Sequence, residues 1–223
     1  MLKLMQTLRD PDIGCPWDAK QDFKSISHCT VEEAYELFDA IQVGDMAHIK
    51  EELGDLLFQT VFYAQMADEQ GDFDFNDIVD GLTRKLVRRH PHVFPTGDLH
   101  QPTQTRLSEE DVKAQWEVIK QEERKNKKQT RQFDDIPAAL PALIRAYKIQ
   151  KRLQNVTSLE DKKAEMIDLL DKLTDPGEEQ SPQVLVGELL FEVADFARQL
   201  GVDSEAALAV KNQAVVRQES ERE

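Results

Sequence analysis

The sequence predicts an all-α protein, and three observations support this fold class. Apolar residues recur at helical spacing, three and four positions apart, through most of the 223 residues. Glycine, proline and aspartate residues divide the chain into segments of helix length, where they serve as caps and breaks. No segment of useful length alternates apolar and polar residues, as a half-buried β-strand would. We therefore expect helices packed on helices around an apolar core.

The amino-terminal region is expected to contain a short helix, a loop and a second helix. The short helix covers residues 1–9, and an irregular loop follows over residues 10–29. Thr30 is expected to cap the second helix, and Glu33, three residues later, completes the pattern of a capping box. Gly44 is expected to end this helix, because glycine readily adopts the left-handed conformation that follows helix ends.

Three further helices are expected before residue 127. The third helix, over residues 45–70, carries apolar residues around most of its circumference, so we expect it to be largely buried. The fourth helix, over residues 74–89, ends in a basic patch that either compensates the helix dipole or binds phosphate. The basic patch consists of Arg84, Lys85, Arg88 and Arg89. A fifth helix follows at about residues 108–126.

The second half of the chain is expected to contain four more helices. The segment over residues 124–131 holds five Lys and Arg residues and little that is apolar, so we expect it to be a solvated connection. Asp175-Pro176-Gly177 is the clearest break among the later helices. The expected helices cover about residues 138–155, 158–173, 182–200 and 203–219.

An acidic stretch between Glu32 and Asp55 is the main candidate for a functional site. Glu33 and Glu36 lie three residues apart on the second expected helix, and Glu52 has the same spacing from Asp55 on the third. Residues three apart share a helix face, so four carboxylates can converge between the two helices. Converging carboxylates repel each other unless a cation lies among them, and oxygen ligands suit Mg²⁺ or Mn²⁺. Because the chain contains 43 Asp and Glu residues, the alternative is an acidic face exposed to solvent.

The formal net charge of −15 argues against nucleic-acid binding in general and against binding to an anionic membrane surface. An anionic substrate would need a bound divalent cation and a local basic cluster to offset this charge. No run approaches the roughly 20 apolar residues of a membrane-spanning helix, and no charged-then-apolar leader precedes the first helix. We therefore expect a cytoplasmic protein with reduced thiols at Cys15 and Cys29, whose spacing is not that of a zinc site.

The chain repeats itself at an offset of 133 residues. Gly54-Asp55-Leu56-Leu57-Phe58 returns as Gly187-Glu188-Leu189-Leu190-Phe191. At the same offset, three of the four candidate metal ligands are replaced by apolar residues. The replacements are Met166 for Glu33, Leu169 for Glu36 and Leu185 for Glu52. We therefore expect the second copy to be the same helical unit without a metal site.

Six segments, taken in order, carry a resemblance to a known family. They are Gly14-Cys15-Pro16-Trp17-Asp18, Glu32-Glu33-Ala34-Tyr35-Glu36, Glu52-Leu53-Gly54-Asp55-Leu56-Leu57-Phe58, Arg88-Arg89-His90-Pro91-His92-Val93-Phe94, Trp116-Glu117 with Lys120, and Ile136-Pro137 through Lys148-Ile149-Gln150-Lys151-Arg152. The chain resembles the MazG family of nucleoside triphosphate pyrophosphohydrolases in its two-domain form. The combination covers roughly residues 1–155 and is far more specific than any one segment.

The resemblance implies tandem all-α units of four-helix type that form a homodimer. The first unit, with the intact acidic motif, would span residues 1–126, and a degenerate second unit would span residues 138–223 after a linker over residues 127–137. The resemblance also implies hydrolysis of nucleoside triphosphates to the monophosphate and pyrophosphate, with Mg²⁺ or possibly Mn²⁺ as the cofactor. Nucleoside triphosphates are then the expected partners, with neither a membrane nor direct nucleic-acid binding.

Single residues of this sequence acquire expected roles from the resemblance. The expected metal ligands are Glu33, Glu36, Glu52 and Asp55. In a metal-assisted hydrolysis, a spare carboxylate takes the proton of the attacking water, and the candidates are Glu32 and Glu33. The expected substrate-binding cations are Lys85, Arg88, Arg89 and Lys120. Trp17 either stacks on a nucleotide base or anchors its own loop.

The sequence departs from the family pattern in two places. Thr157-Ser158-Leu159-Glu160 stands where two-domain relatives carry Gly-Phe-Asp-Trp, and Asp22-Phe23 stands where a Thr-His type pair is expected. The second unit of such relatives can be the competent one, so the main alternative is a catalytically weak or inactive nucleotide-binding or scaffold protein.

Two more classes of protein would share part of the acidic pattern. A dUTPase or a phosphoribosyl-ATP pyrophosphohydrolase would use the same acids on a narrow range of substrates. A di-iron bundle would need ExxH pairs, and the nearest pattern, Asp45-Met46-Ala47-His48, lies at the wrong end of its helix.

Overall fold

A computed structural model shows that the chain folds into α-helices, as predicted. It describes residues 1–103, 106–126, 132–153, 157–174 and 180–222, and these ranges contain no β-strand. The chain divides into two compact units, Met1–Lys120 and Gln121–Glu223. No helix within the described ranges combines the length and the apolar character needed to cross a bilayer.

The domain boundaries predicted from the sequence stay a prediction. They place units over residues 1–126 and 138–223, with a linker over residues 127–137. Part of that linker, residues 127–131, lies outside the described residues, and so does the predicted break at Asp175-Pro176-Gly177.

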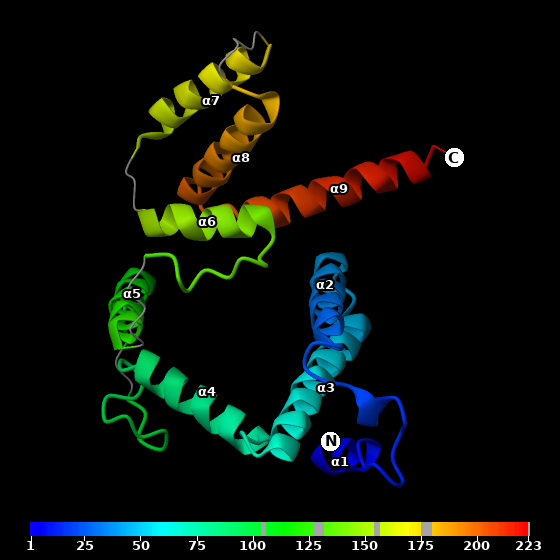
Figure 1. Cartoon of the computed structure of the whole chain (residues 1–223). Helices are drawn as coiled ribbons and strands as arrows, with labels where there is room; N and C mark the ends of the chain where they lie inside the picture. The colour runs from blue at the N-terminus through cyan, green and yellow to red at the C-terminus, as the bar shows by residue number, and fades with distance from the viewer. Residues whose placement is uncertain (104–105, 127–131, 154–156, 175–179, 223) are drawn as a thin grey trace. The chain divides into compact units, whose positions relative to one another are not determined.

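The first unit is built around a pair of packed helices. The helices that begin in it are α1 (Leu2–Leu8), α2 (Ser27–Val43), α3 (Met46–Gln70), α4 (Phe75–Arg89) and α5 (Glu109–Asn126), with a single 3-10 turn, η1 (Asp18–Lys20). Figure 1 shows α2 and α3 side by side, joined by a short turn. α1 and α4 also contact α3, so α3 is the central helix of this unit.

The ends of α3 and the start of α4 follow the predicted signals. Gly44 and Gly71 adopt left-handed conformations, with φ of 79° and 74°, at the ends of α2 and α3. The Asp45 side chain caps α3 by accepting hydrogen bonds from two backbone N–H groups of its first turn. Asp74 and Asp77 form a complete capping box at the start of α4.

The predicted capping box at Thr30 and Glu33 is wrong. α2 begins earlier, at Ser27, so both residues lie inside the helix. The Thr30 hydroxyl makes a hydrogen bond of 2.8 Å to the hydroxyl of Tyr63 on α3, and the ring of Phe23 stacks on Tyr63 with centroids 5.6 Å apart. The Thr30 hydroxyl is thus engaged with α3, and neither Thr30 nor Glu33 caps α2.

The core of the first unit lies where α1 and the segment before α2 meet α3. Its buried side chains are Met5, Ile26, Val61, Phe62 and Met66, with Phe23, Phe58, Tyr63 and Phe75 packed against them. The expectation that α3 is largely buried holds for one face only. Leu53 and Leu57, in its amino-terminal half, are 53% and 48% exposed, because α2 covers only one side of the helix.

The loop before α2 is fastened to α1 and α3 by Arg9 and Gly14. The Arg9 guanidinium, 7% exposed, lies 2.7 Å from the Glu69 carboxylate and also donates to the backbone carbonyls of Asp18 and Gln21. Gly14 packs so closely on carbonyl oxygens at the end of α1 and just after it that a Cβ atom would collide with them. These contacts hold the Gly14–Asp18 segment in place.

The second unit repeats the helix pair of the first. It contains α6 (Ala142–Leu153), α7 (Leu159–Thr174), α8 (Pro182–Gln199) and α9 (Ser204–Ser220), with α7 packed along α8 (Figure 1). Moved back by 133 residues, α7 and α8 fall on residues 26–41 and 49–66, which are the places of α2 and α3.

One helix of the second unit begins later than predicted. The helix predicted over residues 138–155 starts at Ala142, immediately after Pro141, because a proline disfavours helical geometry in the residue before it. Residues 154–155 of that prediction lie outside the described residues.

Candidate metal centre

Packing of α2 on α3 brings the predicted acidic residues together. One carboxylate oxygen from each of Glu33, Glu36 and Glu52 lies within 4.8 Å of the other two. Asp55 lies one turn after Glu52 and acts electrostatically on Glu33. Two helices thus present a cluster of carboxylates to one point, which is the arrangement that the i,i+3 spacing predicts. Their role as metal ligands stays a prediction.

Glu33 has a raised pKa, which shows how strongly the cluster disfavours its own charges. The largest cause is partial burial, followed by the negative charge of Asp55. Glu36, Glu52 and Glu32 raise the pKa further. The four charges that raise the pKa of Glu33 all belong to neighbouring carboxylates.

Glu52 is the most deeply buried member of the cluster, at 6% exposed. Its Oε1 atom lies 2.7 Å from Nε2 of His48, one helical turn earlier. Its Oε2 atom is buried and has no hydrogen-bond partner. A buried carboxylate oxygen without a partner is costly, so this atom needs a proton or a cation.

The residues present fit a divalent cation. The cluster offers only carboxylate oxygens, which suit hard cations such as Mg²⁺ and Mn²⁺, and one of its oxygens is buried and unpaired. A cation at this point would relieve both the repulsion at Glu33 and the unpaired oxygen of Glu52. Sequence reasoning missed His48 as a contact of Glu52, although their i,i+4 spacing was a usable signal.

Comparison with known proteins identifies the family. The chain is 45% identical over 222 residues to the nucleoside triphosphate pyrophosphohydrolase of Escherichia coli (strain K12), covering 96% of this chain and 82% of that protein. The chain belongs to the MazG family. Residues 21–94 also match the family model of the MazG nucleotide pyrophosphohydrolase domain, and this range contains all four predicted metal ligands.

Two further relatives agree with the MazG assignment. The chain is 38% identical over 212 residues to the nucleoside triphosphate pyrophosphohydrolase/pyrophosphatase MazG of Thermotoga maritima, covering 93% of this chain and 78% of that protein. It is also 38% identical over 141 residues to the nucleoside triphosphate pyrophosphohydrolase of Mycobacterium tuberculosis, covering 62% of this chain and 40% of that protein.

The second copy of the helix pair has apolar residues at three of the four positions of the acidic cluster. Leu169 and Leu185, which stand in the places of Glu36 and Glu52, are buried at 9% and 2% exposed. The buried oxygen of the first copy thus has a buried leucine as its counterpart. A buried apolar side chain needs no hydrogen-bond partner. The second copy therefore has, at these two positions, no buried carboxylate that a cation would stabilise.

The second copy also carries its own cation. The Lys162 ammonium, 7% exposed, contacts the carboxylates of Glu192, Glu165 and Asp195 between α7 and α8. At the offset of 133 residues, Cys29 stands in the place of Lys162. The helix pair α7–α8 therefore places a cation among its acids, whereas the four charges that raise the pKa of Glu33 all belong to carboxylates.

The predicted substrate-binding residues lie at other points of the first unit. Lys85 and Arg89 are half-buried and Arg88 is exposed, all near the end of α4. Trp17 is 58% exposed in the loop before α2. Lys120 on α5 lies over the ring of Trp116, 5.9 Å from its centroid. Their roles in substrate binding stay predictions.

Trp116 is a second residue to which sequence reasoning gave no role. Its ring meets His90 edge to face at 5.3 Å, which links α5 to the end of α4. Its indole Nε1 atom is buried and has no hydrogen-bond partner. The spacing of Trp116 and Lys120, four residues apart on one helix, was the available signal.

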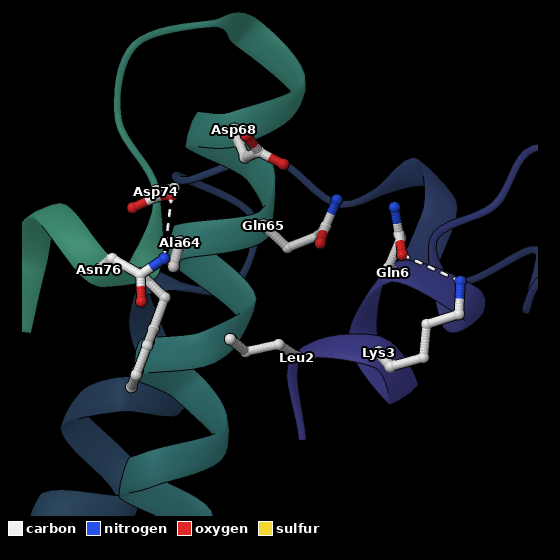
Figure 2. A pocket seen from close by; sticks show the side chains of 9 residues that line it. Leu2, Lys3, Gln6, Ala64, Gln65, Asp68, Asp74 and Asn76 are labelled. Carbon is white, nitrogen blue, oxygen red and sulfur yellow. Dashed lines mark hydrogen bonds between the residues drawn. The ribbon is translucent and has the colours of Figure 1, made fainter.

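A separate hollow lies between α1, α3 and the start of α4. It has a volume of about 240 Å³ and is lined mainly by amides, carboxylates and the stem of Lys3. In Figure 2, Gln6 lines it from α1 and Gln65 lines it from α3. None of the predicted site residues lines this hollow.

Proposed function

We propose that this chain hydrolyses nucleoside triphosphates to the nucleoside monophosphate and pyrophosphate with the help of Mg²⁺, as part of the upkeep of the nucleotide pool. The observation that carries the proposal is the unpaired, buried oxygen of Glu52 beside Glu33 and Glu36. Three relatives that cover much of the chain bear the name nucleoside triphosphate pyrophosphohydrolase, which supports the same reaction.

The metal ion would be held by Glu33, Glu36, Glu52 and Asp55. When bound there, Mg²⁺ neutralises charge on the phosphates and makes water a stronger nucleophile. The four carboxylates are held near one another because each belongs to α2 or α3, and these two helices pack closely. They also supply more negative charge than one divalent ion needs, which leaves a carboxylate to act as a base.

Glu32 and Glu33 are the candidates for that base. Glu33 holds its proton unusually well, because burial and the neighbouring acids raise its pKa. A carboxylate with a raised pKa is a stronger proton acceptor than an ordinary carboxylate. Glu32 directly precedes Glu33 on α2, and its side chain is exposed to solvent, to which it can pass a proton.

Lys85, Arg88, Arg89 and Lys120 are the residues that we assign to the phosphates. Their positive charges would attract a triphosphate locally, although the formal net charge of the chain is −15. Lys120 is held over Trp116, whose buried indole nitrogen lacks a partner. Trp17 offers an exposed ring on which a base can stack.

A direct assay tests the proposed reaction. Pyrophosphate release should be measured for a panel of nucleoside triphosphates with Mg²⁺, using wild type and Glu52→Gln. We expect Glu52→Gln to lower turnover by at least about 100-fold with helicity unchanged, because it removes a charged ligand from the cluster. Glu188→Gln, which changes the acid that stands in the place of Asp55 in the second copy, should keep normal turnover.

Two outcomes of this assay would contradict the proposal. Unchanged turnover in Glu52→Gln would remove the acidic cluster from the mechanism. Nucleotide binding by the wild type without pyrophosphate release from any triphosphate would instead favour an inactive nucleotide-binding or scaffold protein.

A homodimer and a cytoplasmic location complete the proposal. Tyr35 on α2 and Leu53 and Leu57 on α3 are about half exposed, although they belong to the helices that carry the site. Exposed apolar side chains on adjacent helices favour association with a second copy. The cytoplasmic location agrees with the free cysteines at Cys15 and Cys29.

A further inference from the structure

The first turn of α3 contains a histidine in contact with the acidic cluster. Nε2 of His48 lies 2.7 Å from Oε1 of Glu52, and the two residues are four apart on the same helix. The His48 side chain is 45% exposed, whereas that of Glu52 is 8% exposed. His48 therefore reaches from the surface to a buried carboxylate.

The backbone of His48 is fixed by the cap of α3. Oδ1 of Asp45 accepts hydrogen bonds from the backbone N–H groups of Ala47, at 2.9 Å, and of His48, at 3.2 Å. The imidazole then points along the helix toward the next turn. A carboxylate oxygen only accepts hydrogen bonds, so Nε2 must carry the hydrogen in this contact.

The contact gives the two oxygens of Glu52 different roles. Oε1 is held by His48, while Oε2 is buried and lacks a partner. Without His48, the end of the Glu52 side chain could rotate about its last bond, which has a broad energy minimum. His48 removes this freedom and keeps one oxygen available to the cluster.

The second copy of the helix pair lacks both members of this contact. At the offset of 133 residues, Ser181 stands in the place of His48 and Leu185 in the place of Glu52. Ser181 is the N-cap residue of α8, and Leu185 is buried. The histidine and the acid are thus present together in one copy and replaced together in the other.

We propose that His48 is a positioning residue of the metal centre, which holds Glu52 so that its second oxygen binds the divalent cation with Glu33 and Glu36. This inference rests on the proposed function, because it takes this cluster to be the cation site. Hydrogen bonds to metal-binding side chains typically change metal affinity 10- to 100-fold. A surface pair that only supports the helix would change stability slightly and leave metal affinity unchanged.

The test is a titration of the full chain with Mn²⁺. Binding is measured as the loss of the free-ion signal in electron paramagnetic resonance. Wild type is compared with His48→Leu, His48→Gln and the exposed control Lys50→Leu, and Glu52→Gln measures any Mn²⁺ bound elsewhere. We expect His48→Leu to bind at least about 10-fold more weakly, with helicity unchanged. His48→Gln should recover most of the affinity, because its amide also donates, and Lys50→Leu should bind like wild type.

Each contrary outcome overturns the inference in a recognisable way. Equal affinity in wild type and His48→Leu shows that His48 does not position the ligand. Equal weakening in His48→Leu and His48→Gln shows that the donated hydrogen bond is not the cause. No Mn²⁺ binding by wild type overturns the cation site itself, whereas binding without pyrophosphate release rejects only the proposed reaction.

Discussion

At the scale of single residues, Glu33 reports most directly on the acidic cluster. Its pKa is raised first by burial and then by the charges of four neighbouring carboxylates. A raised pKa means that the folded chain holds the proton more tightly than the unfolded chain does. The cluster therefore opposes folding whenever Glu33 is charged and no cation is present.

This opposition predicts a pH dependence of stability. In the presence of EDTA, the free energy of unfolding should fall as the pH rises from 4.5, the ordinary pKa of this group, through its raised value in the folded chain. Urea unfolding at a series of pH values measures this slope. Glu33→Gln should remove that part of the slope, while Glu51→Gln, on the exposed side of α3, should keep it. Identical slopes in wild type and Glu33→Gln would show that Glu33 does not titrate as described.

Residue spacing predicted the acids well and their supporting contacts poorly. The i,i+3 pairs located Glu33, Glu36 and Glu52 because carboxylates on one helix face must lie together. The contact of His48 with Glu52 was not predicted, although the two residues lie four apart on one helix. Phe23, a departure from the family pattern, stacks on Tyr63, which no local pattern in the sequence indicates.

At the scale of elements, the two helix pairs differ in how they accommodate the carboxylates that lie between their helices. α7 and α8 enclose Lys162, whose pKa is lowered by burial but raised further by Glu192 and Glu165, so that the net shift is upward. Asp195, 1% exposed, is held in turn by Arg198 at 2.7 Å. The pair is therefore joined by charges that the chain itself supplies.

Removal of this internal cation should weaken the second helix pair. Lys162→Met leaves three carboxylates close together without their ammonium partner, which typically costs about 3–5 kcal/mol. Chemical denaturation followed by circular dichroism should show the loss, whereas Lys163→Met, an exposed neighbour, should change stability by less than about 0.5 kcal/mol. A Lys162→Met protein as stable as wild type would show that the contacts of Lys162 are not a net source of stability.

Helix ends were predicted correctly where the capping residue bonds to its own backbone neighbours. The start of α2 was predicted wrongly, because the expected capping residue bonds to another helix instead. Asp45, Gly71 and Asp74 act through their own backbone neighbours, and their helices end or begin at the predicted places. Thr30 satisfies the pattern of a cap, but its hydroxyl bonds to Tyr63 on another helix. A contact between two helices is not visible in the local pattern of the sequence.

At the scale of the whole molecule, the same helix pair occurs twice, and only the first copy carries the acidic cluster. The all-α class and the repeat were predictable because apolar periodicity and the Gly54 and Gly187 segments are visible in the chain. The internal cation of the second copy was not predicted, because Lys162 and Asp195 meet only when α7 packs on α8. The structure thus explains how the second copy can lose its acids and keep the fold.

The central claim is that the acids of α2 and α3 hold a divalent cation. Its most direct test is a crystal of the full chain grown with Mn²⁺ and a non-hydrolysable nucleoside triphosphate analogue, measured by anomalous diffraction. We predict an anomalous peak within coordination distance of Glu33, Glu36, Glu52 and Asp55, and no peak between α7 and α8. A map without a peak at these four side chains, with their carboxylates turned toward solvent, would contradict the claim.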